Sequence, residues 1–298
     1  MKKTFAYLYS KAFCVASEFL FGKTLYTLGG AKDVVFDKKI RYCGDENLYL
    51  NVCRQKNQSE KLPLFIYLHG GGFVSGAPDY RKAIISNIAA DGYVVVGIFY
   101  GLAPKYVFPA PVENIYKALA FLKTNAGKYN FDDGKIYVAG ESAGASLAVT
   151  LGAISSNDKM KNFFNLDPGS KDTAFSGIGA ICGLYDTHSA LNSGYPYMKE
   201  YLCSYADKDV DGLLNDEDAQ YMSPIRFINS SFPKTFVITG ERDALREDGF
   251  RLSEKLQAVN VENGAFHGVG GTAIHAFPVG QALPVAKTAL GEMLKFFK

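Results

Sequence analysis

The stretch Lys135-Ile-Tyr-Val-Ala139-Gly140-Glu-Ser142-Ala-Gly144 decides the fold. Its first half is an apolar run of the kind that forms a buried strand, and the small residues after Gly144 favour a helix. The pattern G-x-S-x-G marks a sharp turn when it lies between a strand and a helix. Its two glycines let the backbone bend without a side-chain clash. We therefore expect the Ser142 hydroxyl to project, as a nucleophile, from the carboxyl end of a strand.

Further apolar runs recur along the chain, with helical segments between them. Strands are expected over 34–42, 47–53, 64–69, 94–100, 135–139, 178–182 and 235–239, and helices over 80–90, 112–125 and 283–297. Such alternation is typical of a parallel sheet with helices on both faces. The sequence thus predicts an α/β fold with a mostly parallel central sheet, in one domain over residues 1–298.

Two segments depart from this alternation. Residues 3–22 carry apolar side chains at helical spacing along one stripe, which predicts an amphipathic helix that packs on another part of the molecule. Residues 184–232 are rich in Tyr, acidic in the middle and without a clear strand. We interpret them as an insertion over the sheet.

Charge and cysteine content exclude several classes of function. The formal net charge of +2 is too small for a protein that binds nucleic acid or an anionic membrane through a basic face. The five cysteines form no C-x-x-C pair, which favours reduced thiols in a cytoplasmic protein. Ser10-Lys11 interrupts the N-terminal apolar run, and no stretch reaches transmembrane length.

A glycine run, His69-Gly-Gly-Gly-Phe73, follows the strand expected over 64–69. Backbone N–H groups in such a loop can point at a developing oxyanion and stabilise its charge. No Gly-Lys-Ser/Thr follows, so a phosphate-binding loop is disfavoured. We expect His69 to hold the loop in place.

An acid that could orient a base follows the strand over 235–239. Where a serine in this turn is the nucleophile, the acid and then the base come later in the chain, each on a loop after a late strand. Asp243 fits this position, with Glu241 and Asp248 as nearby competitors.

The base must come from four histidines, at positions 69, 188, 267 and 275. His275 lies before the final predicted helix, after the acid in chain order, and is the expected base. His267, eight residues earlier, is the alternative.

With these residues in place, the chain resembles the hormone-sensitive-lipase-like branch of the α/β hydrolases over nearly its whole length. The resemblance rests on His69-Gly-Gly-Gly-Phe73, Tyr100-Gly-Leu-Ala-Pro104, Phe108-Pro-Ala110, Gly140-Glu-Ser-Ala-Gly144, Ser223-Pro224, Asp243-Ala-Leu-Arg246 and His275-Ala-Phe277. It implies that Ser142 is the nucleophile, Asp243 the acid and His275 the base. It also implies oxyanion donors from the backbone of Gly71, Gly72 and Ala143.

The resemblance further implies a cap over the site, built from segments of about 1–30 and 184–232. Three positions depart from the family pattern. Ala276 stands where Gly is usual, Gly101 where Arg is usual and Ala244 where Pro is usual. None of the three removes a reacting group.

The activity implied is hydrolysis of small to medium carboxylic esters through an acyl-enzyme, without a required cofactor. A serine peptidase or amidase on the same fold is the alternative within the enzymes, because the same three side chains serve both. A hydrolase-like protein that binds a ligand without turnover is the alternative from another class. The expected partner is a small ester, and a homo-oligomer is compatible with the sequence.

One acidic segment lies outside this scheme. Residues 207–218 match the pattern of a calcium-binding loop, with oxygen-bearing side chains at alternating positions and Gly212 at the turn. The candidate ligands are Asp207, Asp209, Asp211, Leu213 through its carbonyl, Asn215 and Asp218. The sequence therefore allows a structural calcium ion here, with a solvated acidic loop as the simpler interpretation.

Aromatic residues are abundant: 22 Phe and 19 Tyr, with no Trp. A buried Tyr needs both an apolar wall and a partner for its hydroxyl. Several Tyr fall in the two proposed cap segments. We hypothesise that some of them line an acyl or aryl pocket near Ser142.

Overall fold

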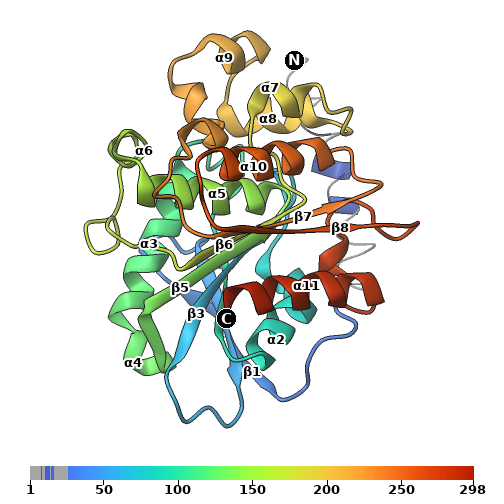
Figure 1. Cartoon of the computed structure of the whole chain (residues 1–298). Helices are drawn as coiled ribbons and strands as arrows, with labels where there is room; N and C mark the ends of the chain where they lie inside the picture. Colours follow the sequence, from blue (N-terminus) through green and yellow to red (C-terminus); the bar gives the residue numbers. More distant parts are fainter. Residues whose placement is uncertain (1–7, 9–10, 14, 17–25) are drawn as a thin grey trace.

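The computed structural model describes residues 8, 11–13, 15, 16 and 26–298 (Figure 1). The helix predicted over 3–22 therefore lies mostly outside the described residues; the few residues of it that are described are helical. Within this part of the chain, no helix combines the length and the apolar character needed to cross a membrane.

The described residues form one sheet of eight strands in the order β1-β2-β4-β3-β5-β6-β7-β8. The strands are β1 (Val34–Arg41), β2 (Tyr49–Gln55), β3 (Leu62–Leu68), β4 (Val94–Phe99), β5 (Phe131–Glu141), β6 (Gly177–Ile181), β7 (Thr235–Gly240) and β8 (Asn263–Gly268). β2 pairs antiparallel with both β1 and β4, and all other pairs are parallel. The prediction of a mostly parallel sheet is confirmed.

Helices cover both faces of the sheet. They are α2 (Lys82–Ala90), α3 (Ala110–Thr124), α4 (Ala126–Tyr129), α5 (Ala143–Ser156), α6 (Asp158–Phe163), α10 (Arg246–Ala258) and α11 (Pro284–Phe297). Because alternate residues of a strand point to opposite faces, Ile66 joins the apolar core under α3, α5 and α10, whereas Phe65 joins the core under α2 and α11. Both β3 side chains are fully buried.

Several elements were not predicted from the sequence, and two of them, β8 and α10, belong to the sheet or pack on it. β8 has the sequence Asn-Gly-Ala-Phe-His-Gly and is partly exposed at the edge of the sheet, so it lacks a continuous apolar run. α10 was also missed, although it packs directly on β7 and β8.

Residues 184–232, which we call the cap segment, carry only short helices. They are α7 (Thr187–Leu191), α8 (Met198–Ala206) and α9 (Val210–Asn215), followed by the 3₁₀ turns η2 (Asp218–Met222) and η3 (Pro224–Phe227). Figure 1 shows α7, α8 and α9 at the top of the molecule, beyond the sheet. The segment packs on the glycine loop, because the Tyr205 and Phe73 rings stack with centroids 3.9 Å apart.

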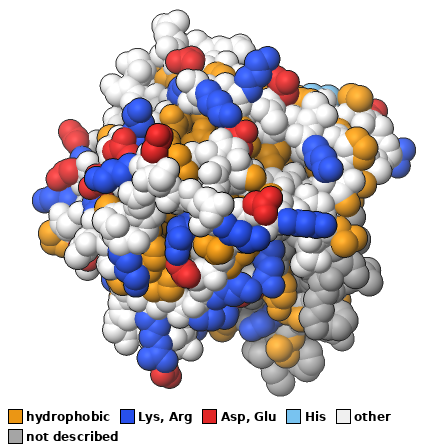
Figure 2. All heavy atoms as spheres, turned by 90° about the horizontal axis from the view of Figure 1, so that it is seen from below, with side chains coloured by type: hydrophobic (Ala, Val, Ile, Leu, Met, Phe, Trp, Pro, Cys, Tyr) orange, Lys and Arg blue, Asp and Glu red, His pale blue; other side chains and the backbone are white. Residues whose placement is uncertain are grey.

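The opposite end of the molecule has a mixed surface. Figure 2 shows it from below, with Lys and Arg side chains spread over the face and Asp and Glu interspersed among them. The cap segment and the loops at the carboxyl ends of the strands lie at the other end, and the candidate site lies there.

Candidate active site

Ser142 sits on a sharp turn between β5 and α5. Its backbone has φ 55° and ψ −121°, a conformation that costs about 1–3 kcal/mol and occurs mostly at functional sites. The Ser142 N–H donates to the carbonyl of Ile181 on β6 at 2.9 Å, which ties the turn to the neighbouring strand. A Cβ at Gly144 would lie 2.0 Å from the Leu68 carbonyl oxygen, so the turn requires glycine there.

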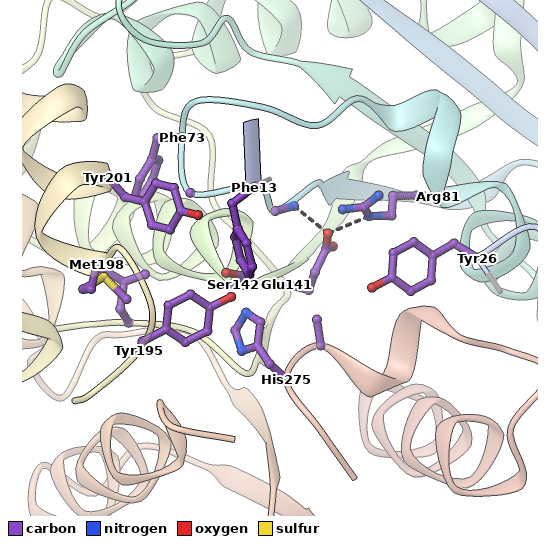
Figure 3. Close-up of a pocket in the computed structure, with 15 residues that line it drawn as sticks. Phe13, Tyr26, Phe73, Arg81, Glu141, Ser142, Tyr195, Met198, Tyr201 and His275 are labelled. Atoms are coloured by element: carbon purple, nitrogen blue, oxygen red, sulfur yellow. Dashed lines mark hydrogen bonds and ion pairs between the residues drawn. The ribbon is translucent and has the colours of Figure 1, made fainter. Parts of the chain in front are cut away.

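The structure brings the three predicted side chains to one place. The Asp243 Oδ1 atom lies 3.0 Å from His275 Nδ1. Asp243 follows β7, and His275 lies between β8 and the 3₁₀ turn η4 (Phe277–Val279). Ser142 and His275 line the same pocket (Figure 3). Because Nδ1 is engaged by Asp243, Nε2 is the imidazole nitrogen available to a hydroxyl.

The Asp243 carboxylate is buried, with an exposed fraction of 3%. Burial is the largest single influence on its pKa and would raise it, and the charge of the His275 imidazole beside it opposes this effect. Hydrogen bonds with His275, the Leu245 N–H and the Cys182 thiol add to the stabilisation, so the pKa of Asp243 is below its usual value. Asp243 is thus held as a carboxylate that can orient an imidazole and stabilise its charged form.

The competing residues lie elsewhere. His267, on β8, pairs through Nδ1 with the Thr239 hydroxyl at 2.8 Å. Glu241 is exposed and accepts from the Gly270 N–H at 2.6 Å. In the part of the chain that the structure describes, Asp243 is the carboxylate that hydrogen-bonds His275.

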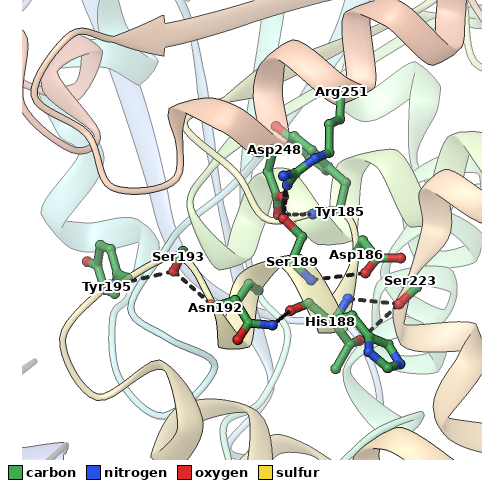
Figure 4. Close-up of polar contacts among 12 residues, drawn as sticks. Tyr185, Asp186, His188, Ser189, Asn192, Ser193, Tyr195, Ser223, Asp248 and Arg251 are labelled. Atoms are coloured by element: carbon green, nitrogen blue, oxygen red, sulfur yellow. Dashed lines mark hydrogen bonds and ion pairs between the residues drawn. The ribbon is translucent and has the colours of Figure 1, made fainter.

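Asp248 belongs to a separate polar cluster (Figure 4). Its carboxylate accepts from the Tyr185 N–H at 3.2 Å, from the Ser189 hydroxyl and from Arg251 Nη1 at 3.1 Å. Ser189 lies on α7 and Asp248 on α10. The cluster therefore joins the cap segment to the body of the molecule.

The glycine loop borders the same pocket as Ser142 and His275. Gly71 and Gly72 have φ of 117° and 60°, and a Cβ at Gly72 would lie 2.8 Å from the Tyr201 ring. His69 is fully buried, its ring stacks on Tyr100 with centroids 4.5 Å apart, and the Tyr100 hydroxyl donates to the His69 carbonyl at 2.7 Å. These contacts hold the loop, which agrees with the structural role expected of His69.

Aromatic side chains narrow the pocket from the cap segment. Tyr195 and Tyr201 line it, and the Tyr195 ring packs edge-on against the His275 ring with centroids 4.7 Å apart. The pocket has a volume of about 80 Å³. These two tyrosines of the cap segment thus line the pocket that contains Ser142, as we hypothesised from the sequence. By contrast, Tyr197 is exposed, and Tyr205 is buried against Phe73.

Sequence reasoning missed two charged residues that line this pocket. Glu141 and Arg81 form a buried ion pair beside Ser142, with 2.6 Å between Arg81 Nε and Glu141 Oε1. Glu141 was visible only as the variable position of the G-x-S-x-G pattern. Its partner lies 60 residues away in the 3₁₀ turn η1 (Pro78–Arg81), and no local pattern connects the two.

The acidic segment 207–218 is shaped by helix capping. The Asp209 carboxylate accepts from the Gly212 N–H at 3.0 Å and caps α9, and Asp216 forms an ion pair with Lys208. Among the residues that the structure describes, no three His, Cys, Asp or Glu side chains form a group that could hold a metal ion. The predicted carboxylate ligands Asp207, Asp209, Asp211 and Asp218 therefore form no such group in the described structure, in which Val210–Asn215 of this segment form α9.

Known proteins with similar sequences and structures include several esterases. A family model described as the alpha/beta hydrolase fold matches residues 65–278. Esterase LipQ of Mycobacterium tuberculosis (strain ATCC 25618 / H37Rv) is 30% identical over 210 residues, which cover 68% of this chain and 47% of LipQ. The acetyl esterase of Salmonella choleraesuis (strain SC-B67) is 30% identical over 239 residues, 78% of this chain and 70% of that protein.

The fold also matches solved structures over its full length. The crystal structure of esterase B from Lactobacillus Rhamnosis (HN001) aligns with a TM-score of 0.87 at 20% identity, over 100% of this chain and 96% of that one. At this identity the likeness shows the fold. The chain spans about half the length of LipQ.

Proposed function

The chain belongs to the alpha/beta hydrolase fold family, and from this premise we propose that it is a serine hydrolase of carboxylic esters. The observation that carries the proposal is the pocket in which Ser142, His275 and the glycine loop meet, with Asp243 hydrogen-bonded behind the imidazole. A nucleophile, a base, an acid that orients the base and a set of N–H donors are the parts that acyl transfer needs. The esterases among its relatives support the same assignment.

In the proposed mechanism, His275 Nε2 takes the proton from Ser142 as its Oγ attacks the ester carbonyl. The backbone N–H groups of Gly71, Gly72 and Ala143 stabilise the tetrahedral oxyanion. His275 then returns the proton to the leaving alcohol, and an acyl-enzyme remains on Ser142. Water, activated by His275, attacks this ester and releases the acid. Asp243 stabilises the charged imidazole in both steps.

The dimensions of the pocket favour small acyl groups. A site for a drug-sized ligand occupies about 300–1,000 Å³, whereas this pocket offers about 80 Å³. Besides the reacting groups and the Glu141–Arg81 ion pair, the pocket has aromatic and apolar wall residues, with Tyr195, Tyr201 and Met198 among them. We therefore propose acetyl and other short acyl esters as substrates, in line with the similarity to an acetyl esterase.

The test compares wild type with Ser142→Ala on p-nitrophenyl acetate, butyrate and octanoate. We expect wild type to hydrolyse the acetate best, and Ser142→Ala to lose activity by about 10⁴-fold or more. The matching acetyl p-nitroanilide, an amide, separates an esterase from an amidase. Wild type as inactive as Ser142→Ala on every ester would contradict the proposal.

A further inference from the structure

A buried carboxylate joins the two loops that carry the reacting groups. Glu141 has an exposed fraction of 1%, and it directly precedes Ser142. Its Oε1 atom accepts from the Gly70 N–H at 2.5 Å and from Arg81 Nε at 2.6 Å (Figure 3). Gly70 directly precedes the two loop glycines proposed to hold the oxyanion.

The three groups are packed closely enough to fix one loop against the other. A Cβ at Gly70 would lie 3.0 Å from Glu141 Oε1 and 3.1 Å from Ser142 Cβ. Both hydrogen bonds are to a charged acceptor, a class that is shorter and about twice as strong as neutral pairs. A shift of the glycine loop would therefore stretch a short bond to the residue beside the nucleophile.

Stability alone does not explain an ion pair in this place. Both side chains are almost fully buried, at 3% and 1% exposure for Arg81 and Glu141. The cost of removing two charges from water often exceeds their attraction, and apolar replacements of similar volume are commonly as stable. An oxyanion donor, by contrast, must be held to within about 0.5 Å of its productive position.

Two tyrosines lie beside the ion pair. Burial and the nearby Glu141 charge raise the pKa of Tyr67 well above its usual value, so Tyr67 stays a neutral phenol beside Glu141. The Arg81 guanidinium lies over the Tyr26 ring, 5.1 Å from its centroid. Aromatic side chains therefore lie next to both members of the ion pair.

We propose that Glu141 and Arg81 are positioning residues of the oxyanion hole. The Arg81-held carboxylate fixes the Gly70 N–H, and through it the Gly71 and Gly72 amides, relative to Ser142 Oγ. The expected effect of the ion pair on kcat rests on the proposed serine esterase function. Its expected effect on the glycine loop rests only on the hydrogen bond from the Gly70 N–H.

The first test removes both charges together. Glu141→Gln with Arg81→Met leaves no lone buried charge, so we expect a melting temperature (Tm) near that of wild type. Because misplacement by about 1 Å can cost about 100-fold, we expect kcat for p-nitrophenyl acetate to fall at least 10-fold and KM to change less than threefold. Wild-type Tm together with wild-type kcat would overturn the proposal.

Glu141→Asp separates position from charge. It keeps the carboxylate but withdraws it by one methylene, so the bond to the Gly70 N–H should be lost and kcat should fall. Full kcat in this variant would show that the charge suffices and would contradict positioning. Each variant is assayed well below its own Tm, so that unfolded protein does not lower the measured kcat.

Hydrogen exchange tests the loop without any substrate. In the double variant, we expect the peptide that contains Gly70–Gly72 to exchange faster than in wild type, with the α10 peptides unchanged. If wild type hydrolyses no ester, the proposed function fails, and the exchange of this peptide still decides the inference. Unchanged exchange would overturn it.

Discussion

Two buried carboxylates, in different regions of this molecule, accept hydrogen bonds from the same kinds of donor. Glu141 accepts from an arginine and from the Gly70 N–H, and Asp248 accepts from an arginine and from the Tyr185 N–H. Their side chains are 1% and 3% exposed. Each joins segments that are far apart in the sequence (Figures 3 and 4).

The arginines show how the two differ. Arg81 is 3% exposed, whereas Arg251 is 53% exposed and its charge is screened by solvent. Burial therefore outweighs the favourable contacts at Asp248, and its pKa is raised. A buried carboxylate paired with an arginine thus has two different roles in this molecule: Glu141 connects the loops beside the reacting groups, and Asp248 connects the cap segment to α10.

The largest expected effect is a loss of kcat when His275, which lines the same pocket as Glu141, is replaced. We expect His275→Ala to lower kcat by about 10³–10⁴-fold, because the hydroxyl loses its base. His267→Ala, which removes contacts with Thr239 and with the Phe250 ring, should change kcat less than about threefold. Steady-state rates on p-nitrophenyl acetate measure both. A larger loss in the His267 variant would reassign the base.

The next effect compares the two carboxylates directly. Glu141→Gln should lower kcat about 10-fold when assayed well below its own Tm, because a neutral oxygen holds Gly70 less tightly. Its Tm should also fall, because the buried Arg81 charge loses its carboxylate partner. Asp248→Asn makes the same chemical change outside the reacting loops and should keep kcat within about twofold of wild type, a small effect of the kind usual away from a site. Equal losses of kcat in the two variants would remove the distinction between them.

A smaller effect concerns pH. Because the pKa of Asp248 is raised in the folded state, the folded protein takes up a proton before the unfolded chain does as pH falls. Wild type should therefore gain stability relative to Asp248→Asn as pH is lowered from 7 towards the ordinary pKa of 3.8. Thermal melting of both proteins over this range measures the gap. If Asp248→Asn instead gained stability relative to wild type as the pH is lowered, the folded state would favour the charged form of the carboxylate, which would contradict the prediction.

The smallest expected effect concerns the third acidic cluster, at 207–218. Its Asp209 side chain caps α9 and Asp216 pairs with Lys208, so millimolar calcium should leave Tm unchanged to within about 1 °C. Asp211→Asn provides the control. If calcium raised the Tm of wild type but not that of Asp211→Asn, our expectation would be wrong and the calcium site that the sequence pattern predicts would be supported.

Local patterns accounted for much of the fold and for the core of the site. The apolar runs located seven of the strands, and the strand-turn-helix context identified Ser142. Chain order favoured Asp243 over its neighbours Glu241 and Asp248 without excluding them, and the contact of Asp243 with His275 agrees with the expected pairing. The partly exposed edge strand β8 carried too weak a pattern to find.

Other features depend on contacts that no short pattern encodes. Arg81 lies in η1, between β3 and α2, whereas Glu141 is the last residue of β5, so only the folded chain brings them together across 60 residues of sequence. The acidic segment matched a calcium pattern, but the same Asp209 that would bind the ion also caps a helix. In the folded structure the Asp209 side chain caps α9, a role that the calcium pattern in the sequence does not reveal.

The most direct test of the central assignment is covalent labelling with a p-nitrophenyl alkylphosphonate, followed by peptide mass spectrometry. We expect one phosphonyl group per chain, on the peptide that contains Ser142, formed with release of p-nitrophenol and with loss of esterase activity. Asp243→Asn should slow this labelling, because the imidazole that activates Ser142 loses its partner. Labelling of another residue, or complete labelling with activity retained, would contradict the account.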